Sequence, residues 1–395
     1  MQEFISNLIT NIRIKLASFA KVNRIPLPPN TLDEISMEEI VGRELVKMNA
    51  DKIAGFVRGK VILVTGAGGS IGSELCRQIP GFYPQKLILL GHGENSIFNI
   101  EKELKINHPH TAIESVIADI QDKKRLEDVF AHFRPAIIFH AAAHKHVPLM
   151  ELNPSEAIKN NVFGTRNVAE CALDYKAERF VYISSDKAVN PSSIMGGTKR
   201  LAELMLQSME GTSKDTILLT VRFGNVLGSR GSVLPLFTQQ IEAGGPVTVT
   251  HPDMIRYFMT IPEAVHLIFQ SCVMAKGGEI FILDMGRPVK ILDMAYRVIR
   301  MSGLTPDEDI KVVYTGIRPG EKLVEELFTA EEKLKAVKHD SIYVCESLAF
   351  SEEHLHETLK KLEEMVAHDP TFDLSNEIRS VINRVIPGFS KGEIH

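Results

Sequence analysis

The sequence has few cysteines, little net charge and no long hydrophobic run. A formal net charge of −5 over 395 residues gives no electrostatic basis for binding nucleic acid. The cysteines form no Cys-x-x-Cys pair, which argues against a disulfide framework or a zinc site and favours reduced, buried thiols in a cytoplasmic protein. They are Cys76, Cys171, Cys272 and Cys345.

Membrane and metal signals are also scarce. No stretch reaches the apolar length that crosses a bilayer, and the N-terminus lacks a signal-peptide core with a cleavage site. Residues 3–20 carry apolar side chains at helical spacing, which predicts a helix docked on the core or on a partner subunit. Weak contact with a membrane surface is the alternative. The 14 histidines show no metal-ligand spacing, so no metal is predicted.

Apolar strands alternate with helices between residues 60 and 223. This alternation predicts an α/β protein with a Rossmann-type, doubly wound parallel sheet and a smaller C-terminal substrate-binding lobe. The expected strands are residues 60–65, 86–90, 112–117, 136–140, 179–184 and 217–223. The first expected helix opens at the glycine-rich turn and ends at residue 78. The others span residues 95–105, 123–133, 155–175 and 193–208.

The rhythm changes after residue 224, where glycine and proline cluster. Helices are expected at residues 262–274, 291–301 and 322–327. Residues 353–385 read as two amphipathic helices. The predicted divisions are an N-terminal helical extension and linker (1–58), a dinucleotide-binding domain (59–224), a substrate lobe with returns to the core (225–330) and a helical tail (331–395).

A glycine-rich turn follows the first strand and opens a helix. Gly66, Gly69 and Gly72 have the spacing at which backbone can approach a pyrophosphate, with Ser70 and Ile71 at the start of the helix. The helix N-terminus favours the negative charge of the phosphates. This context predicts a dinucleotide site.

The end of the second strand bears on the choice of dinucleotide. Gly91 stands where an acid would hold the adenosine ribose, His92 follows it, and Glu94 comes later. No arginine is present there for a 2′-phosphate, so NAD is favoured, with NADP left open.

Residues after the third and fourth strands complete the predicted cofactor site. Asp119 either meets the adenine edge or forms a helix cap, and Ile120 beside it is a further predicted cofactor contact. Small side chains after the fourth strand suit a chain that passes under a cofactor, and these are Ala141, Ala142 and Ala143.

Three polar residues follow the fifth strand, at the sheet edge where ligands of such folds bind. These are Ser185, Asp186 and Lys187, and Lys199 lies in the next helix. A loop with a surface ion pair is the simplest alternative. A hydride acceptor beside an acid and a base favours oxidation of a sugar followed by elimination of water.

Six ordered stretches resemble the extended short-chain dehydrogenase/reductase superfamily. Within it, the chain resembles the CapD-like nucleotide-sugar 4,6-dehydratases of polysaccharide biosynthesis. The stretches are residues 64–75 (VTGAGGSIGSEL), 142–148 (AAHKHVP), 183–191 (ISSDKAVNP), 222–229 (RFGNVLGS), 256–264 (RYFMTIPEA) and 318–322 (RPGEK).

One position departs from the superfamily pattern Tyr-x-x-x-Lys. Met195 stands where the tyrosine base would be, and methionine has no titratable proton. Larger members of the dehydratase group resemble this chain in having methionine there. The base for the C4 hydroxyl is therefore unassigned.

The resemblance implies conversion of UDP-GlcNAc, or a close UDP-sugar, to the UDP-4-keto-6-deoxy sugar for surface glycan synthesis. It implies Lys187 as the base at C5, Asp186 as the acid at O6 and Ser185 as a hydrogen-bonding partner at C4. Lys199 would bind the nicotinamide ribose. For Lys187 to act as a neutral base, burial and nearby positive charge would have to lower its pKa.

The resemblance also implies contacts to the UDP-sugar. They are Lys145, His146, Asn225, Arg256, Arg318 and Glu321. His146 could equally be a packed core histidine, and Arg256 a surface ion-pair partner.

Three rival functions stay open: a UDP-sugar 4-epimerase, a 4,6-dehydratase that inverts C5, and a non-catalytic NAD(P)-binding sensor. A homo-oligomer is expected, with a dimer through the helices at residues 155–175 and 193–208 as the default.

Overall fold

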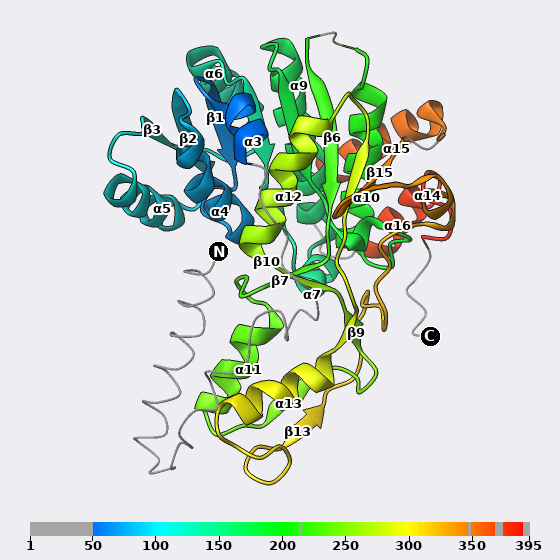
Figure 1. Ribbon diagram of the computed structural model, residues 1–395. Coiled ribbons are helices and arrows are strands. Elements are labelled where there is room, and N and C mark those ends of the chain that lie inside the picture. The colour runs from blue at the N-terminus through cyan, green and yellow to red at the C-terminus, as the bar shows by residue number, and fades with distance from the viewer. Residues whose placement is uncertain (1–49, 213–214, 347–348, 368–373, 390–395) are drawn as a thin grey trace.

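The computed structural model describes residues 50–212, 215–346, 349–367 and 374–389. A nine-stranded sheet lies at its centre (Figure 1). In spatial order, the strands are β14 (Val337–His339), β15 (Ile342–Cys345), β11 (Ile280–Leu283), β6 (Ile217–Arg222), β5 (Arg179–Ile183), β4 (Ile137–His140), β1 (Val61–Thr65), β2 (Lys86–Gly91) and β3 (Ile113–Ile117). The strands from β11 to β3 are all parallel, which confirms the predicted doubly wound sheet.

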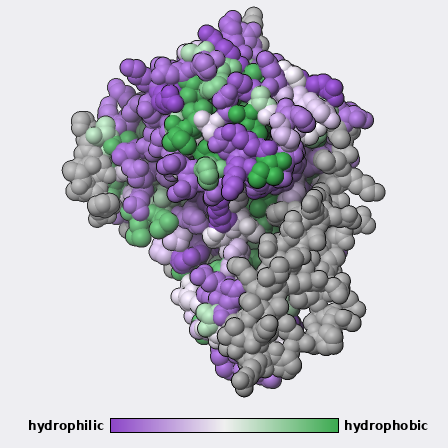
Figure 2. All heavy atoms as spheres, turned by 90° about the vertical axis from the view of Figure 1, so that its left-hand side faces the viewer, coloured by the Kyte–Doolittle hydropathy of each residue, from purple (hydrophilic) through white to green (hydrophobic). Residues whose placement is uncertain are grey.

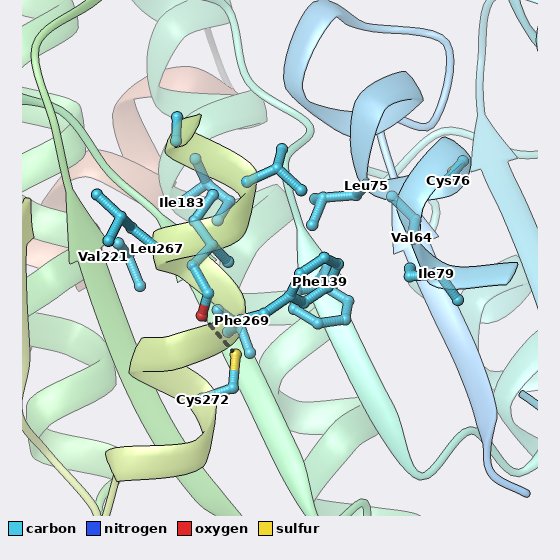
Figure 3. Close-up of a cluster of buried hydrophobic side chains, with 14 of the residues drawn as sticks. Val64, Leu75, Cys76, Ile79, Phe139, Ile183, Val221, Leu267, Phe269 and Cys272 are labelled. Carbon is cyan, nitrogen blue, oxygen red and sulfur yellow. Dashed lines mark hydrogen bonds between the residues drawn. The ribbon is translucent and has the colours of Figure 1, made fainter. Parts of the chain in front are cut away.

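Helices cover both faces of the sheet, so its strands are near-continuous apolar runs. One face packs against α3 (Ala50–Val57), α4 (Ser70–Gln78), α5 (Glu94–Asn107) and α12 (Ile261–Met274). The other packs against α6 (Lys123–Phe133), α9 (Thr165–Asp174) and α10 (Ile194–Met209). Figure 3 shows the first face, where Phe269 meets the Phe139 ring edge-on at 5.5 Å between centroids. Cys272 is buried there and donates a hydrogen bond to the Ile268 carbonyl.

The helix predicted at residues 155–175 is interrupted. The chain forms α7 (Val147–Leu152), α8 (Pro154–Ile158) and a π-helical turn (Lys159–Gly164) before α9 begins. Within the turn, Asn161 accepts a hydrogen bond from the His144 amide at 2.8 Å and donates one to the His144 carbonyl at 2.9 Å. The irregular turn thus pins the loop that follows β4, as π-bulges often do at functional sites.

A smaller lobe lies beyond the carboxyl ends of the strands (Figure 1). It has its own apolar cluster, built around Phe237, Val249, Phe258 and Ile299. Its elements are β7 (Asn225–Leu227), α11 (Val233–Glu242), β8 (Val247–Val249), β9 (Ile255–Arg256), β10 (Phe258–Thr260), β12 (Val289–Lys290), α13 (Ile291–Met301) and β13 (Val312–Tyr314).

Two predictions for the C-terminal half are wrong. Residues 322–327 are not helical. They run alongside β9, where the Ile255 amide donates a hydrogen bond to the Leu323 carbonyl. The tail is not wholly helical, since only α14 (Ala330–Lys335) precedes β14 and β15, which add to the edge of the main sheet. Short apolar segments here find a free strand edge, which local sequence does not reveal.

The last two helices, α15 (Glu352–Ala367) and α16 (Ser375–Ile382), pack on α10 and α8. Leu355, Leu362 and Ile378 are buried against Ile194 and Leu204. The tail therefore covers the α10 surface through which the sequence predicted pairing of subunits.

The side that carries α5 and β3 has a largely hydrophilic surface with scattered hydrophobic patches (Figure 2). Its exposed large apolar residues include Phe98, Ile106 and Ile117. Across the described ranges, no helix is both long and apolar enough to span a bilayer. The amphipathic segment predicted at residues 3–20 and most of the helical extension and linker predicted at residues 1–58 lie outside the described residues; the end of that extension contains α3.

Candidate active site

A cavity of about 720 Å³ lies between the carboxyl edge of the sheet and the lobe. The loops after β1, β4, β5 and β6 line one side, and residues of β9, α11 and the segment 315–325 line the other. Strand order reverses between β1 and β4. The cavity therefore lies at the topological switch point, where open α/β sheets bind ligands.

The glycine turn after β1 has no room for side chains. Gly66 has φ +64°, and a Cβ there would lie 2.7 Å from the Ala142 amide nitrogen. A Cβ on Gly72 would lie 2.1 Å from the Gly66 carbonyl oxygen. Glycine is required at both positions, and the turn brings bare backbone to the start of α4 as a pyrophosphate cradle would need.

The predicted cofactor residues divide into two groups. Those that line the cavity are Gly69, Ser70, Ile71, Gly72, Ala141, Ala143 and Lys199. Those placed outside it, at the ends of β1 to β4, are Gly66, His92, Glu94, Asp119, Ile120 and Ala142. Asp119 accepts a hydrogen bond from the Gln121 amide at 2.9 Å, so its carboxylate caps a turn in this structure.

The residues after β5 form a short 3₁₀ turn, Asp186–Ala188. Asp186 Oδ1 accepts hydrogen bonds from Ser185 Oγ at 2.8 Å and from Lys187 Nζ at 2.9 Å. Its other oxygen, Oδ2, is buried and has no hydrogen-bond partner within the described part of the chain. Ser185 and Lys187 line the cavity, whereas the Asp186 side chain has no exposed surface. These groups are turned inward, which rules out the surface ion pair considered from the sequence.

The charge state of Lys187 differs from the expectation. Burial acts to lower its pKa, but Asp186 and Glu325 outweigh burial and hold the pKa above its ordinary value. Lys187 Nζ also donates to Asn225 Oδ1 at 3.3 Å. In the free protein Lys187 is therefore an ammonium paired with Asp186, and it becomes a base only by passing on a proton.

Lys199 and Met195 approach the cavity from α10, whose N-terminus is capped by Ser193. Lys199 Nζ donates to the Ile183 carbonyl at 2.9 Å, and burial lowers its pKa to about 8. Met195 is 2% exposed and offers only a thioether at the wall of the cavity.

All six predicted substrate contacts line this same cavity. Lys145 Nζ donates to the Arg230 carbonyl at 2.8 Å, and burial lowers the pKa values of Lys145 and His146. Arg256 extends from β9 and donates to the Leu323 carbonyl at 3.2 Å. In the segment 315–325, Arg318 forms an ion pair with Glu321. Arg256 and Arg318 give the lobe side of the cavity basic side chains suited to phosphate, and Lys145 adds a cation from the loop after β4.

Sequence reasoning missed Glu325. This carboxylate is 5% exposed, lines the cavity and lies 3.8 Å from Lys187 Nζ. Because residues 322–327 were predicted to be helical, the alternation of inward and outward side chains was not recognised; it directs Glu325 inward and leaves Val324 exposed. Reading that segment as a strand would have found it.

No group of three or more His, Cys, Asp and Glu side chains in the described ranges is arranged to hold a metal ion.

Comparison with known proteins establishes the family. A model described as "Polysaccharide biosynthesis protein" matches residues 62–347, and the chain belongs to this family. It is 53% identical over 85% of its length to the capsular polysaccharide biosynthesis protein CapD of Staphylococcus aureus, and 54% identical over 76% to the probable polysaccharide biosynthesis protein EpsC of Bacillus subtilis. The chain spans 57% and 50% of those two proteins, about half their lengths.

One relative that the match covers over most of its own length is named as an enzyme. The inverting UDP-N-acetylglucosamine 4,6-dehydratase of Campylobacter jejuni is 31% identical over 72% of this chain and 82% of its own. Among solved structures, Pen from Bacillus thuringiensis is 35% identical and superposes with a TM-score of 0.69 over 74% of this chain and 90% of its own. A dTDP-glucose 4,6-dehydratase of Streptomyces venezuelae, at 19% identity and TM-score 0.59 over 68% of this chain and 88% of its own, shares the fold.

Proposed function

We propose that this chain is a UDP-sugar 4,6-dehydratase that converts UDP-GlcNAc, or a close UDP-sugar, to the UDP-4-keto-6-deoxy sugar for surface polysaccharide synthesis. One observation carries the proposal: Ser185, Lys187 and Lys199 line the same cavity as the start of α4 and the basic side chains of the lobe. A nucleotide-sugar whose diphosphate met the lobe would have its hexose beside these groups.

The backbone cradle of Gly66 and Gly72 fits a dinucleotide, and we assign it to NAD. When bound, NAD supplies a transient hydride acceptor that allows oxidation at C4 and reduction at C6. Lys199 would bind the nicotinamide ribose, and its charge would stabilise the alkoxide at C4. The prediction of NAD over NADP rests on the absence of an arginine near His92 and Glu94.

Proton movement at C5 falls to Asp186 and Lys187 acting as a unit. As Lys187 Nζ takes the C5 proton, it passes its own proton to Asp186 Oδ1, 2.9 Å away. The pair thereby gains one proton and returns it to C5 at the end of the reaction. Ser185 holds the C4 oxygen. Asp186 remains the predicted acid at O6, and the proton that it gives to the leaving water is matched by the proton that the C4 hydroxyl releases on oxidation.

A product assay tests the proposal. The protein would be incubated with NAD and a panel of UDP- and dTDP-sugars, and loss of water would be followed by mass spectrometry. We expect water loss from UDP-GlcNAc or a close analogue. Binding of NAD without any change in the mass of a sugar would favour the sensor function instead.

Proton NMR of the product separates the remaining rivals. Retention at C5 is expected because Met195 replaces the tyrosine that, by resemblance, inverting members keep. An inverted C5 would match the named activity of the Campylobacter relatives. An unchanged mass with an inverted C4 would match UDP-glucose 4-epimerase, the name of a Rickettsia rickettsii relative that is 31% identical.

The proposal extends to cellular context. The enzyme would act in the cytoplasm as a homo-oligomer, with a UDP-sugar as its small-molecule partner.

A further inference from the structure

Two consecutive residues of β5 hold Lys199 at the wall of the cavity. Lys199 Nζ donates a hydrogen bond to the Ile183 carbonyl at 2.9 Å. It also lies over the ring of Tyr182, 4.7 Å from the ring centroid. Lys199 is 6% exposed and Tyr182 is 0% exposed. Because water has little access to either side chain, the attraction between the ammonium and the face of the ring is weakly screened.

The ring of Tyr182 is itself fixed by the sheet. Tyr182 pairs with His140 of β4, and the two rings are stacked with their centroids 5.9 Å apart. Thr165 donates its hydroxyl proton to the Asn161 carbonyl at 2.8 Å, so it accepts a hydrogen bond from His140 Nε2 at 3.0 Å. Thr65 Oγ1 then donates to His140 Nδ1 at 2.7 Å. The imidazole is therefore neutral, in keeping with the burial that lowers its pKa to about 3, and it supports the ring without adding a charge.

The charged groups around Lys199 leave a role for the ring. Glu203, on the same helix, acts to raise the pKa of Lys199, but burial outweighs it and lowers that pKa to about 8. Glu203 already accepts two hydrogen bonds from Arg222 of β6. In the 3₁₀ turn after β5, Asp186 and Lys187 are paired with each other. An ammonium whose charge partner on α10 already serves an arginine gains from the negative potential at the face of an aromatic ring.

We propose that Tyr182 is the positioning residue of Lys199: the face of its ring binds the Lys199 ammonium, holds it at the cavity and favours its charged form. This inference rests on the proposed function, in which charged Lys199 binds the nicotinamide ribose and stabilises the alkoxide at C4. Met195 and Lys199 are the residues of α10 that line the cavity. Since Met195 has no hydroxyl, Lys199 is the polar group that this helix presents to the reacting carbon.

Fluorination of the ring tests the contact with little change of shape. Ring fluorines withdraw electrons from the face, so phenylalanine with one, two and three fluorines in place of Tyr182 should bind the ammonium progressively less well. The pKa of Lys199 can be read by NMR of isotope-labelled lysine in the cofactor-free protein, with Lys199→Met identifying the signal. That pKa should be kept in Tyr182→Phe and fall stepwise along the fluorinated series, by about 0.5–1.5 pH units in all.

Phe180 is the matched control for this series. It lies on the same face of β5, is also 0% exposed and stacks on His140 at 5.6 Å between centroids, but it does not line the cavity. The same fluorinated residues in place of Phe180 should leave the pKa of Lys199 unchanged. A constant pKa along the Tyr182 series, or an equal fall in both series, would overturn the inference.

Turnover gives a second measurement. Because Lys199 acts in its charged form, the rate of water loss should fall at high pH, and the midpoint of that fall should move to lower pH along the Tyr182 series. An unmoved midpoint beside a lowered pKa would overturn the positioning role. Absence of water loss in the wild type would instead overturn the proposed function, and the NMR titration would still decide whether Tyr182 binds the Lys199 ammonium.

Discussion

Two groups of buried charges lie in this molecule, and they are built in opposite ways. The core network comprises Arg200, Glu203, Arg222 and Glu332. Arg222 binds Glu203 through two hydrogen bonds of 2.6 and 2.7 Å and Glu332 through one of 2.8 Å. Burial acts to raise the pKa of Glu203, but Arg222 outweighs it and holds that pKa below its usual value. The core network therefore has fixed charges and joins α10, β6 and α14.

The pocket cluster comprises Asp186, Lys187, Arg256 and Glu325. Its ion pairs with Glu325 are 3.8 Å long, and Asp186 Oδ2 has no hydrogen-bond partner among the residues described. Two carboxyls thus share one lysine in an incompletely bonded arrangement, in which protons can move. The difference indicates that the core network stabilises the fold, while the pocket cluster gives up stability for chemistry.

Loss of Lys187 should have the largest effect. Lys187→Ala should abolish deuterium uptake at C5 and reduce turnover by about 10²–10⁴-fold, because Lys187 is the proposed base for that proton. Product formation in heavy water measures both. Full uptake in the variant would remove Lys187 as the base. The double variant Asp186→Asn/Lys187→Met should unfold no more easily than the wild type in urea.

Loss of Arg222 should act on stability instead. Arg222→Met removes the arginine that hydrogen-bonds to both buried carboxylates, so the free energy of unfolding should fall by about 3–5 kcal/mol. Urea denaturation measures it. The triple variant Glu203→Gln/Arg222→Met/Glu332→Gln should recover much of the loss, because both buried carboxylates are neutralised along with the loss of Arg222. A small effect of Arg222→Met would remove the distinction between the two groups.

Ser184 connects the groups, and its loss should have an intermediate effect. Its hydroxyl donates to Glu203 Oε1 at 2.6 Å, and Ser185 follows it into the cavity. Ser184→Ala should lower the free energy of unfolding by about 1.5–3 kcal/mol. Ser208→Ala, which removes a local hydrogen bond to the Met205 carbonyl, should cost less than about 0.5 kcal/mol. Equal costs would show that the Ser184 bond is not part of the core network.

Lys199 should show the smallest effect, as a pH dependence of stability. Its folded pKa of about 8 lies below the ordinary lysine value of 10.5, so the folded chain loses this proton first. The cost of burying the charge is present below pH 8 and is relieved between these two values, so this contribution to stability rises with pH.

Urea unfolding of cofactor-free wild type and Lys199→Met, at about pH 7.5 and 9.5, measures that contribution. Wild type should gain stability relative to the variant at the higher pH. A constant difference between the two proteins would contradict the lowered pKa.

The main sheet could be predicted closely because it depends on local patterns. The first six expected strands agree with β1 to β6 within one residue at each end, since each is an apolar run between turns. The glycine turn, Lys187 and Lys199 were predicted from their positions after β1, after β5 and in α10. The break at residues 159–164 was not predictable, since its Asn161 bonds to His144, which is distant in the sequence.

The amino-acid sequence by itself determined the family, the parallel sheet and the loops that carry the polar residues, because these follow from the order of apolar runs, glycines and short motifs. Tertiary structure decided which of those residues face the cavity. It buried Asp186 against Lys187, directed Glu325 inward through pairing with β9, and packed the tail on α10. Burial and proton affinity depend on contacts between distant segments, and local sequence does not specify such contacts.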